Sequence, residues 1–491
     1  MNNKKLKVCL ISAYSTVPPY GILSLAAVLE QHGINVKIID FTIKNVEENV
    51  ILNAVVDSDI IGLSAWSFAM ISEVAKITRI IRERFKKEKF LIWGGVHSTL
   101  FPKEVLEEFD LDAVCVGEGE FALLELVKAL EAGEDIAKIK GFWVRKNEGI
   151  ISTGKREDLV DVSALPKYAW HLIDVNKYII KIKLTLWNEL TLMESRGCPY
   201  RCTFCYAPNM FGQKWRGRTP DQVIEEVKFL KEKYNIHRFD FLDDLPFGGN
   251  RTQTLDFCKK IKELNIQWSC DQRINLVDEE ILRAMKESGI WYIYFGVESG
   301  SRRMLEKIRK VGVTPEKIER AFNQCFKLGI ATMAGFIVGI PGETKEDLRE
   351  SLKLAKKIKA TMIRVANYVP YAGTELYEEA LSRGFKPPIC AEDWGKLGTY
   401  ASVGLSLTEV PKEELMKVQK EMQGYSYWKS IIFALHSLEF NALPYLILYT
   451  ALHINPNSKA PLMIIKLLRP LIWLYSKIGG LKNIFKRKII K

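Results

Sequence analysis

This 491-residue sequence lacks several features that would assign it to a familiar class at once. Its nine cysteines, an odd number without paired spacing, argue against a disulfide framework and for a reducing cytoplasm. It contains no clean run of about 20 apolar residues, so no segment predicts a membrane-spanning helix. The apolar run at Lys7–Ala13 is too short for a signal peptide and has no small-residue cleavage site. We therefore expect a first β-strand there and a cytoplasmic protein.

The positive charge of the chain is unevenly distributed. The formal net charge is +12, and residues 425–491 carry ten Lys or Arg against a single acid, Glu439. The remainder of the chain is close to neutral. This asymmetry indicates a partner for the carboxyl-terminal segment, and it does not favour a nucleic-acid-binding protein.

Residues 1–145 alternate short apolar runs with helical patterns. Continuous apolar strands between helices are typical of a parallel sheet covered on both faces, which predicts a doubly wound, flavodoxin- or Rossmann-like domain. The later strands end in small residues, and open α/β sheets bind ligands at the carboxyl ends of their strands. The expected strands are Lys7–Ala13, Val36–Asp40, Ile60–Ser64, Phe90–Gly94 and Ala113–Gly117.

The rest of the chain divides into a connector at 146–188, a second α/β region at 189–400 and a basic helical region at 401–491. The second region repeats strand and helix six times, which is fewer than the eight units of a closed TIM barrel. We therefore expect a partial (β/α)₆ barrel with its chemistry at the carboxyl ends of the strands. The expected strands are Leu190–Glu194, Arg238–Asp243, Gln267–Gln272, Trp291–Val297, Ala331–Gly339 and Met362–Val369.

Three cysteines directly follow the first barrel strand. Cys198, Cys202 and Cys205 have the spacing C-x₃-C-x₂-C, and no fourth Cys or His lies close behind. Thiolates suit iron–sulfur clusters and zinc, but a structural zinc site requires four protein ligands. Three thiolates on a four-iron cluster leave one iron open to a small molecule. Zinc binding and incidental buried thiols are the alternatives.

A series of motifs in a fixed order extends this cysteine pattern. The motifs are Pro19–Ala27, Gly62–Ser64, Gly94–His97, Gly117–Glu120, Ser195–Cys205, Phe241–Asp244, Gly296–Ser299 and Gly339–Thr344. With them, the chain resembles the cobalamin-binding radical S-adenosylmethionine (SAM) proteins over roughly residues 15–400.

The resemblance implies a site for SAM around the cysteine triad, which would hold a 4Fe-4S cluster. Asp243 and Asp244 would bind the SAM amino group, because carboxylates pair well with an ammonium. Arg273 would pair with the SAM carboxylate, and Glu298 would reach a ribose hydroxyl. Phe204 and Gly339 are implied to contact the adenine and to shape its edge, respectively. The alternatives are a helix-capping acidic pair for the two aspartates and a structural salt bridge for Arg273.

The resemblance also implies a cobalamin site on the first domain. The residues implied to cradle it are Ser64, Gly94, Gly95, His97, Gly117 and Glu118. The alternative is an ordinary flavodoxin-like sheet with turn glycines. The Asp-x-His-x-x-Gly motif that supplies a cobalt ligand in many cobalamin domains is absent from this sequence. Trp66 is a residue that could cover the lower face of the corrin instead.

Proteins that share these motifs cleave SAM reductively and abstract hydrogen from an unactivated carbon. Methyl transfer from cobalamin is the expected outcome here, with a flavodoxin or ferredoxin as the implied electron donor. Radical oxidation, cyclisation or carbon–carbon bond formation is the first alternative, since those enzymes carry the same motifs. A non-catalytic cobalamin sensor or carrier is the second, although an open-iron cluster has no use in a pure binder.

The carboxyl-terminal segment gives the single clue to the substrate. Ile431–Tyr449 and Pro461–Tyr475 are apolar but interrupted by polar residues and Pro, with basic residues scattered among them. This composition fits helices lying in a membrane surface, at the inner face of the membrane. A lipid or other hydrophobic small molecule is then the expected substrate. A helical cap packed on the barrel is the alternative.

Overall fold

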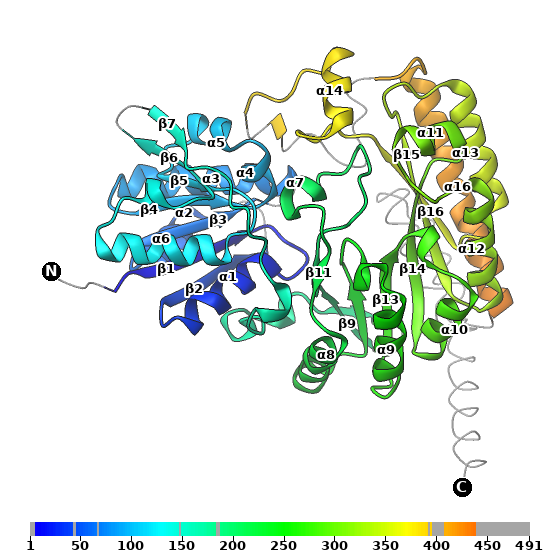
Figure 1. The fold of residues 1–491 in the computed structure, drawn as a ribbon, viewed down its shortest axis with the longest axis horizontal. Helices are drawn as coiled ribbons and strands as arrows, with labels where there is room; N and C mark the ends of the chain where they lie inside the picture. Colours follow the sequence, from blue (N-terminus) through cyan, green and yellow to red (C-terminus); the bar gives the residue numbers. More distant parts are fainter. Residues whose placement is uncertain are drawn as a thin grey trace, which may run out of the picture.

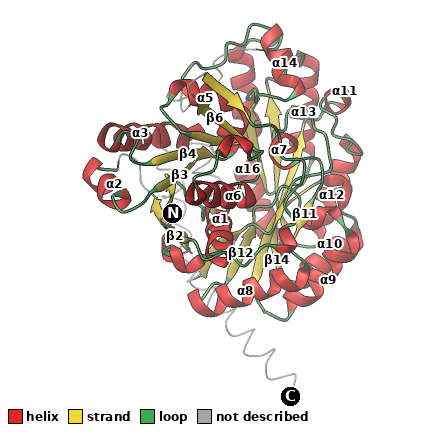
Figure 2. Ribbon diagram, turned by 60° about the vertical axis from the view of Figure 1, so that its left-hand side comes forward, coloured by secondary structure: helices red, strands yellow, loops and turns green. Residues whose placement is uncertain are grey.

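The computed structural model describes residues 5–42, 46–65, 68–146, 149–182, 187–390, 393–394 and 407–437. Within these ranges it shows two α/β regions side by side, each built on a seven-stranded sheet (Figures 1 and 2). Trp66 and the predicted membrane-surface segments beyond residue 437 lie outside the described residues.

The first sheet, here called the front sheet, has the strand order β2-β1-β3-β4-β5-β6-β7. Strands β1 to β5 are parallel, as the continuous apolar runs predict, because residues such as Leu10 and Ile11 are buried on opposite faces of the sheet. The strand bounds are β1 Lys7–Ala13, β2 Asn35–Phe41, β3 Ile60–Ser64, β4 Phe90–Gly94, β5 Ala113–Cys115, β6 Phe142–Lys146 and β7 Gly149–Ser152.

Helices cover both faces of the front sheet. Their bounds are α1 Tyr20–Gln31, α2 Glu48–Val55, α3 Phe68–Phe85, α4 Val96–Leu100, α5 Pro102–Glu108 and α6 Glu120–Ala132. Helices α1 and α6 share one hydrophobic core, and α2, α3 and α5 share the other. The antiparallel hairpin β6–β7 was not among the predicted strands. Strand β6 ends in the exposed residues Arg145 and Lys146, so it lacks the continuous apolar run from which strands were predicted.

The second sheet, here called the barrel sheet, has the order β16-β15-β14-β13-β12-β9-β8 and is open at β16. Strands β9, β12, β13, β14, β15 and β16 of this sheet are parallel, and β8 pairs antiparallel with β9. The strand bounds are β8 Ile180–Ile182, β9 Trp187–Leu192, β12 Arg238–Phe241, β13 Gln267–Gln272, β14 Ile290–Glu298, β15 Ala331–Val338 and β16 Met362–Asn367. The six parallel strands form the predicted partial barrel.

The helices that follow the parallel strands of the second region lie along the outside of the barrel, whereas the short helix after the cysteine motif lies between the two regions (Figures 1 and 2). Thr219 caps α8 through a capping box with Gln222, and Thr344 caps α13 in the same way with Asp347. The bounds are α7 Ala207–Phe211, α8 Pro220–Tyr234, α9 Arg251–Lys262, α10 Glu279–Glu287, α11 Arg302–Lys307, α12 Pro315–Lys327, α13 Lys345–Lys357, α14 Glu375–Ser382 and α16 Lys412–Ser437. A two-stranded ribbon, β10 Ser195–Arg196 and β11 Arg216–Gly217, lies between the two sheets (Figure 1).

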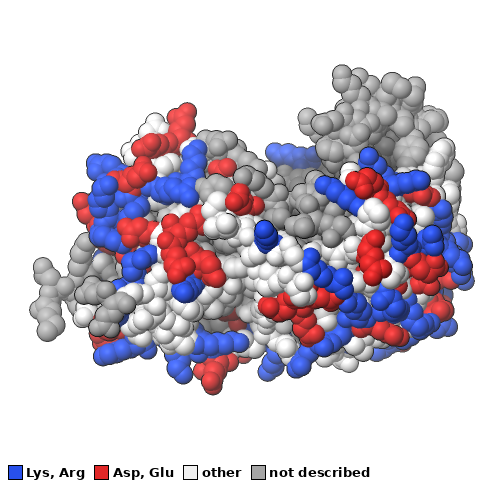
Figure 3. Space-filling model, turned by 90° about the horizontal axis from the view of Figure 1, so that it is seen from above, with Lys and Arg blue, Asp and Glu red and all other residues white. Residues whose placement is uncertain are grey.

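Helix α16 covers the open edge of the barrel sheet. The Ser426 hydroxyl bonds to both the N–H and the C=O of Ile363, at 2.8 and 3.0 Å, and Gln419 donates to Val365 O at 2.9 Å. These bonds satisfy backbone groups that an edge strand leaves free. No helix within the described ranges is long and apolar enough to cross a membrane. On the face shown in Figure 3, basic and acidic side chains are interspersed.

Candidate functional site

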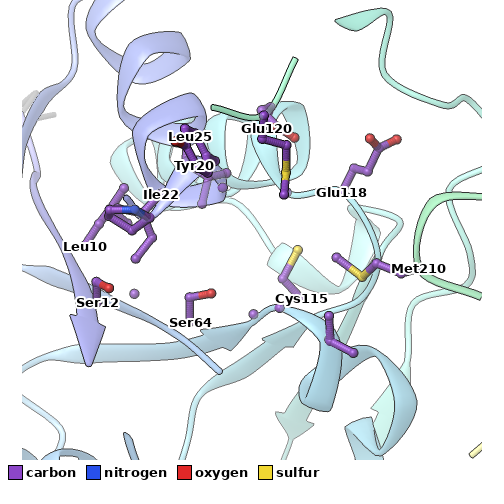
Figure 4. A pocket seen from close by; sticks show the side chains of 18 of the residues that line it. Leu10, Ser12, Tyr20, Ile22, Leu25, Ser64, Cys115, Glu118, Glu120 and Met210 are labelled. Atoms are coloured by element: carbon purple, nitrogen blue, oxygen red, sulfur yellow. The ribbon is translucent and has the colours of Figure 1, made fainter. Parts of the chain in front are cut away.

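A large cavity lies where the carboxyl ends of the front-sheet strands face the barrel. It encloses about 1570 Å³ of empty space, including its open mouth. Ser12 and Ser64 border it from the ends of β1 and β3, and Tyr20 and Leu25 border it from α1 (Figure 4). The barrel contributes lining residues that include Ser195, Arg196, Tyr206, Met210 and Asp244. One cavity therefore joins the two regions at the ends where α/β sheets bind ligands.

Five of the six residues predicted to cradle cobalamin line this cavity. They are Ser64, Gly94, Gly95, Gly117 and Glu118. Gly95 has φ +94°, and a Cβ there would lie 2.8 Å from the Ala65 carbonyl oxygen, so the turn requires glycine. Ser12 Oγ is buried in the same wall and makes no hydrogen bond within the described residues. The glycine at this turn lets a ligand come close to the backbone, and the Ser12 hydroxyl has no partner within the described residues. Both features fit a polar cofactor bound at the ends of these strands.

The sixth residue, His97, does not line the cavity. Its ring is buried against Phe101 and Trp394, with centroid distances of 5.3 and 5.6 Å. Burial lowers the pKa of His97 to about 4, so the ring is neutral at physiological pH. Its surroundings are those of a core histidine packed against Phe101 and Trp394.

The three cysteines of the predicted cluster site, residues 198–205 (the cluster loop), come close enough together for their thiols to interact electrostatically. Burial raises the pKa of Cys205 to about 12 and also raises that of Cys198. Both thiols therefore stay protonated at neutral pH until a metal displaces the proton. Among the described side chains, no three converge on a point where a single metal ion could sit. A four-iron cluster instead spreads its three thiolates over different iron atoms.

The predicted SAM-binding aspartates support the backbone that leads into the cluster loop. Asp243 Oδ1 accepts hydrogen bonds from Glu194 N at 2.9 Å, Ser195 N at 2.5 Å and Ser195 Oγ at 2.8 Å. Asp244 Oδ2 accepts from Gly197 N at 3.2 Å and lines the cavity. Burial raises the pKa of both carboxyl groups, that of Asp243 to about 7. An ammonium group bound beside them would offset this cost of burying charge.

Arg273 also lies at the cluster loop. Its Nη1 donates to Cys202 Sγ at 3.5 Å, and its guanidinium stacks on the Tyr200 ring at 3.6 Å. Asn275 donates to the Tyr200 hydroxyl at 3.0 Å and accepts from Arg273 Nε at 3.2 Å. The guanidinium is thus held beside the thiol of Cys202, one of the predicted cluster ligands.

The other predicted SAM contacts lie further along the barrel rim. Glu298, the last residue of β14, has φ +65° and accepts from Lys310 Nζ at 2.5 Å. A non-glycine residue in this left-handed region stores strain, which is a feature of functional sites. Gly339 has φ +80°, and its N–H donates to Glu343 at 2.7 Å. Phe204 is half-buried against the main hydrophobic core.

Several side chains at the site were not predicted from the sequence. Lys310 and Glu343 are buried partners of predicted residues, and Arg196 and Arg216 hold the Glu118 carboxylate. Arg196 lies inside the cysteine motif, two residues before Cys198, and that position is a signal in the sequence that could have identified it. Arg216 and Lys310 are separated from any motif, and their roles depend on contacts formed by folding.

Comparisons with known proteins agree with this geometry. A model of the B12 binding domain matches residues 6–127, and a model of the Radical SAM superfamily matches residues 194–355. An uncharacterized methyltransferase of Pyrococcus horikoshii is 34% identical over 415 residues, which cover 83% of this chain and 87% of that protein. An anaerobic magnesium-protoporphyrin IX monomethyl ester cyclase of Rubrivivax gelatinosus is 27% identical over 375 residues, covering 74% of this chain and 66% of the cyclase.

A solved structure shares the fold. It is that of the radical S-adenosylmethionine methyltransferase TsrM from Kitasatospora setae, with cobalamin and a [4Fe-4S] cluster bound. The TM-score is 0.65 at 20% identity, over 77% of this chain and 75% of that one. The predicted fold class, a front α/β domain followed by a partial barrel, is confirmed.

Proposed function

This chain belongs to the cobalamin-binding radical SAM family of enzymes, whose cofactors are a 4Fe-4S cluster, S-adenosylmethionine and cobalamin, and from that premise we propose that it is a C-methyltransferase. The proposal is supported above all by the single cavity that the cofactor rim of the front sheet shares with the residues beside the cluster loop. A substrate in this cavity faces both cofactor sites at once. When bound, the cofactors supply a deoxyadenosyl radical and a methyl group.

The residues of the chain position these groups and exclude water. Cys198, Cys202 and Cys205 are proposed as the cluster ligands. Asp244 is exposed to the cavity and is proposed to bind the SAM ammonium, while Asp243 holds the entry to the cluster loop in place. The cavity wall is largely apolar, which suits a neutral or hydrophobic substrate and excludes competing water.

Further SAM and cobalamin contacts are proposed from the motifs that this chain shares with the family. Arg273 is proposed to pair with the SAM carboxylate, Glu298 to reach the ribose, and Phe204 and Gly339 to border the adenine. Cobalamin is proposed to rest on the glycine-rich rim that includes Ser64, Gly94, Gly95 and Gly117. His97 is proposed to support this rim from the core without touching the cofactor.

The first test is reductive SAM cleavage by anaerobically reconstituted protein with hydroxocobalamin added. We expect cluster absorbance, bound cobalt and formation of 5′-deoxyadenosine. Comparative mass spectrometry of lipids, pigments and proteins from cells with and without the gene then identifies the substrate by a missing methyl group. A protein that forms no deoxyadenosine after reduction contradicts the proposal.

The second candidate reaction is radical cyclisation or oxidation of a large hydrophobic substrate. The cyclase relative of Rubrivivax gelatinosus favours it, because that protein aligns with 74% of this chain. The same mass spectrometry separates the two reactions. Ring closure removes hydrogen from the substrate, whereas methylation adds about 14 mass units, the mass of one CH₂ group. A carrier without catalysis would leave both signals unchanged.

We further propose that a lipid or other membrane-associated molecule is the substrate and that the enzyme works at the inner face of the membrane. The support is the basic, apolar composition of residues 425–491. Vesicles containing anionic lipid should float the full-length protein but not a chain ending at Ser437, which keeps the whole of α16 on the barrel. Equal flotation of the two proteins contradicts the membrane contact. A small acidic carrier such as flavodoxin or ferredoxin is proposed as the electron donor.

A further inference from the structure

Two arginines of the β10–β11 ribbon reach into the rim of the front sheet. Arg196 and Arg216 lie opposite each other in this ribbon. Arg196 donates to Glu118 Oε1 at 2.9 Å and to Glu120 Oε1 at 2.5 Å. Arg216 donates to Glu118 Oε2 at 2.7 Å and to the Val160 carbonyl at 2.5 Å. The four charged side chains keep at most 11% of their surface exposed, so this is a buried four-residue ion cluster.

Each side of this cluster leads directly to a cofactor site. On the barrel side, Arg196 is separated from the cluster ligand Cys198 by Gly197, which has φ +79°. A Cβ on Gly197 would lie 2.6 Å from the Lys214 carbonyl oxygen, so the short connection is tightly enclosed. On the front-sheet side, Glu118 directly follows Gly117, one of the glycines of the cavity wall.

The Glu118 carboxylate is oriented toward the arginines of the ribbon. It points away from the centre of the cavity (Figure 4), and both oxygens accept from arginine. The Val160 N–H also donates to Oε2, at 3.1 Å. Planar guanidinium groups with several donors hold carboxylates in a fixed direction, which a lysine cannot do. The acceptor capacity of Glu118 is therefore directed at the barrel and not at a ligand in the cavity.

We propose that Arg196, Arg216, Glu118 and Glu120 form an interdomain clamp that fixes the distance between the cobalamin rim and the cluster loop. The inference rests on the proposed function, which requires both cofactors to face one substrate. A misplacement of about 1 Å can cost on the order of 10²-fold in rate, so such a reaction needs a rigid spacer. The four residues are positioning residues: Arg196, Glu118 and Glu120 border the cavity, but their charged groups bond to one another.

A matched control exists inside the barrel. Glu189 and Arg238 form a buried pair at 3.4 Å, with 6% and 5% of their side-chain surfaces exposed. Both lie at the amino ends of neighbouring barrel strands, at the opposite end of the sheet from the cofactor sites. Breaking either pair leaves an uncompensated buried arginine, so both changes are expected to destabilise the protein. Only loss of the clamp should alter the separation of the two cofactor sites.

The test measures that separation in reconstituted holoenzyme by pulsed electron paramagnetic resonance between the reduced cluster and cob(II)alamin. Wild type and the control Glu189→Gln should give the same single narrow distance. Arg196→Lys and the double variant Glu118→Gln/Glu120→Gln should lose it and give a broad distribution, while keeping iron and cobalt content. Arg196→Lys keeps the charge and provides the measurement if the double variant does not fold.

Two results overturn the clamp. One is a wild-type distance in both clamp variants. The other is a variant that keeps the domain arrangement but loses cobalamin, which makes Glu118 a direct cofactor contact. A wild-type protein that takes up no cobalamin contradicts the proposed function instead. The radius of gyration of the cofactor-free chains then tests the clamp by itself, because it should grow in the clamp variants and not in Glu189→Gln.

Discussion

Replacing Asp243 by alanine should release the backbone that leads into the cluster loop. In the folded protein Asp243 Oδ1 accepts two backbone N–H groups, those of Glu194 and Ser195, and the Ser195 hydroxyl. The Asp243 side chain is buried, with the residue only 3% exposed, so water cannot replace the lost acceptor. Each buried donor left without a partner costs roughly 1–3 kcal/mol, and the hydroxyl can rotate to another acceptor. Two amides therefore give a local loss of roughly 2–6 kcal/mol.

Asp243→Asn separates this support from the charge. The amide oxygen still accepts the two N–H groups, and the pKa of about 7 shows that burial disfavours the charged carboxylate. We expect the Asn variant to keep the stability of wild type or exceed it at pH values above 7, while binding SAM more weakly if the charge contacts the ammonium.

Hydrogen exchange of the Glu194 and Ser195 amides is the direct assay, because it reports local opening without assuming two-state unfolding of a large chain. A loss of about 2 kcal/mol corresponds to roughly 30-fold faster exchange, since 1.4 kcal/mol is about tenfold. Asp240→Ala is the control. Asp240 is a largely buried carboxyl on β12, the strand that precedes Asp243, but it accepts from Ser269 and not from the ribbon. Unchanged exchange in Asp243→Ala refutes the reasoning.

Three further outcomes are expected. Cys202→Ala should abolish cluster absorbance and deoxyadenosine formation, whereas Cys325→Ala, a change at a buried helix cysteine, should leave both in place; a Cys202→Ala protein with a full iron content contradicts the ligand assignment. Gly95→Ala should weaken cobalamin binding, because its Cβ would meet the Ala65 carbonyl, whereas Gly33→Ala has the same positive φ but open space around its Cβ and should bind normally in equilibrium dialysis. Burial raises the pKa of Glu343 from 4.5 to about 8, so its contribution to stability is complete below pH 4.5 and is lost as the pH rises through about 8. Glu343→Gln should flatten the melting temperature between about pH 5 and pH 9, and an unchanged profile argues against this titration.

Much of the fold could be predicted from local patterns. The parallel strands of both sheets are short apolar runs, and Gln267–Gln272 was predicted with the bounds that the structure shows. Helix α13 begins where Thr344 and Asp347 form their capping box. The hairpin β6–β7 and the closure of the sheet edge by α16 could not be predicted in this way. Their stability comes from pairing with a neighbouring strand, and such pairing leaves little periodic signal in the segment itself.

The candidate site likewise contains residues that local sequence patterns could place and residues that they could not. The rim glycines and the cysteine triad lie where the motifs place them, at the carboxyl ends of strands. His97 was predicted as part of the cofactor cradle, but its ring lies in the core against Trp394. A histidine two residues after a glycine pair has the same local sequence in either role. Only the packing of a segment almost 300 residues later distinguishes the two.

The sequence by itself determined the cofactors, because three thiols within eight residues and a series of glycine-rich strand ends are local arrangements that need no distant partner. The tertiary structure decided which charges meet. Arg196 and Arg216 reach Glu118 across 78 and 98 residues of chain, and Arg273 reaches Cys202 across 71. The first two pairs form only when the two regions pack together, and the third forms only when the barrel strands align. The spacing of these residues in the sequence does not indicate such contacts.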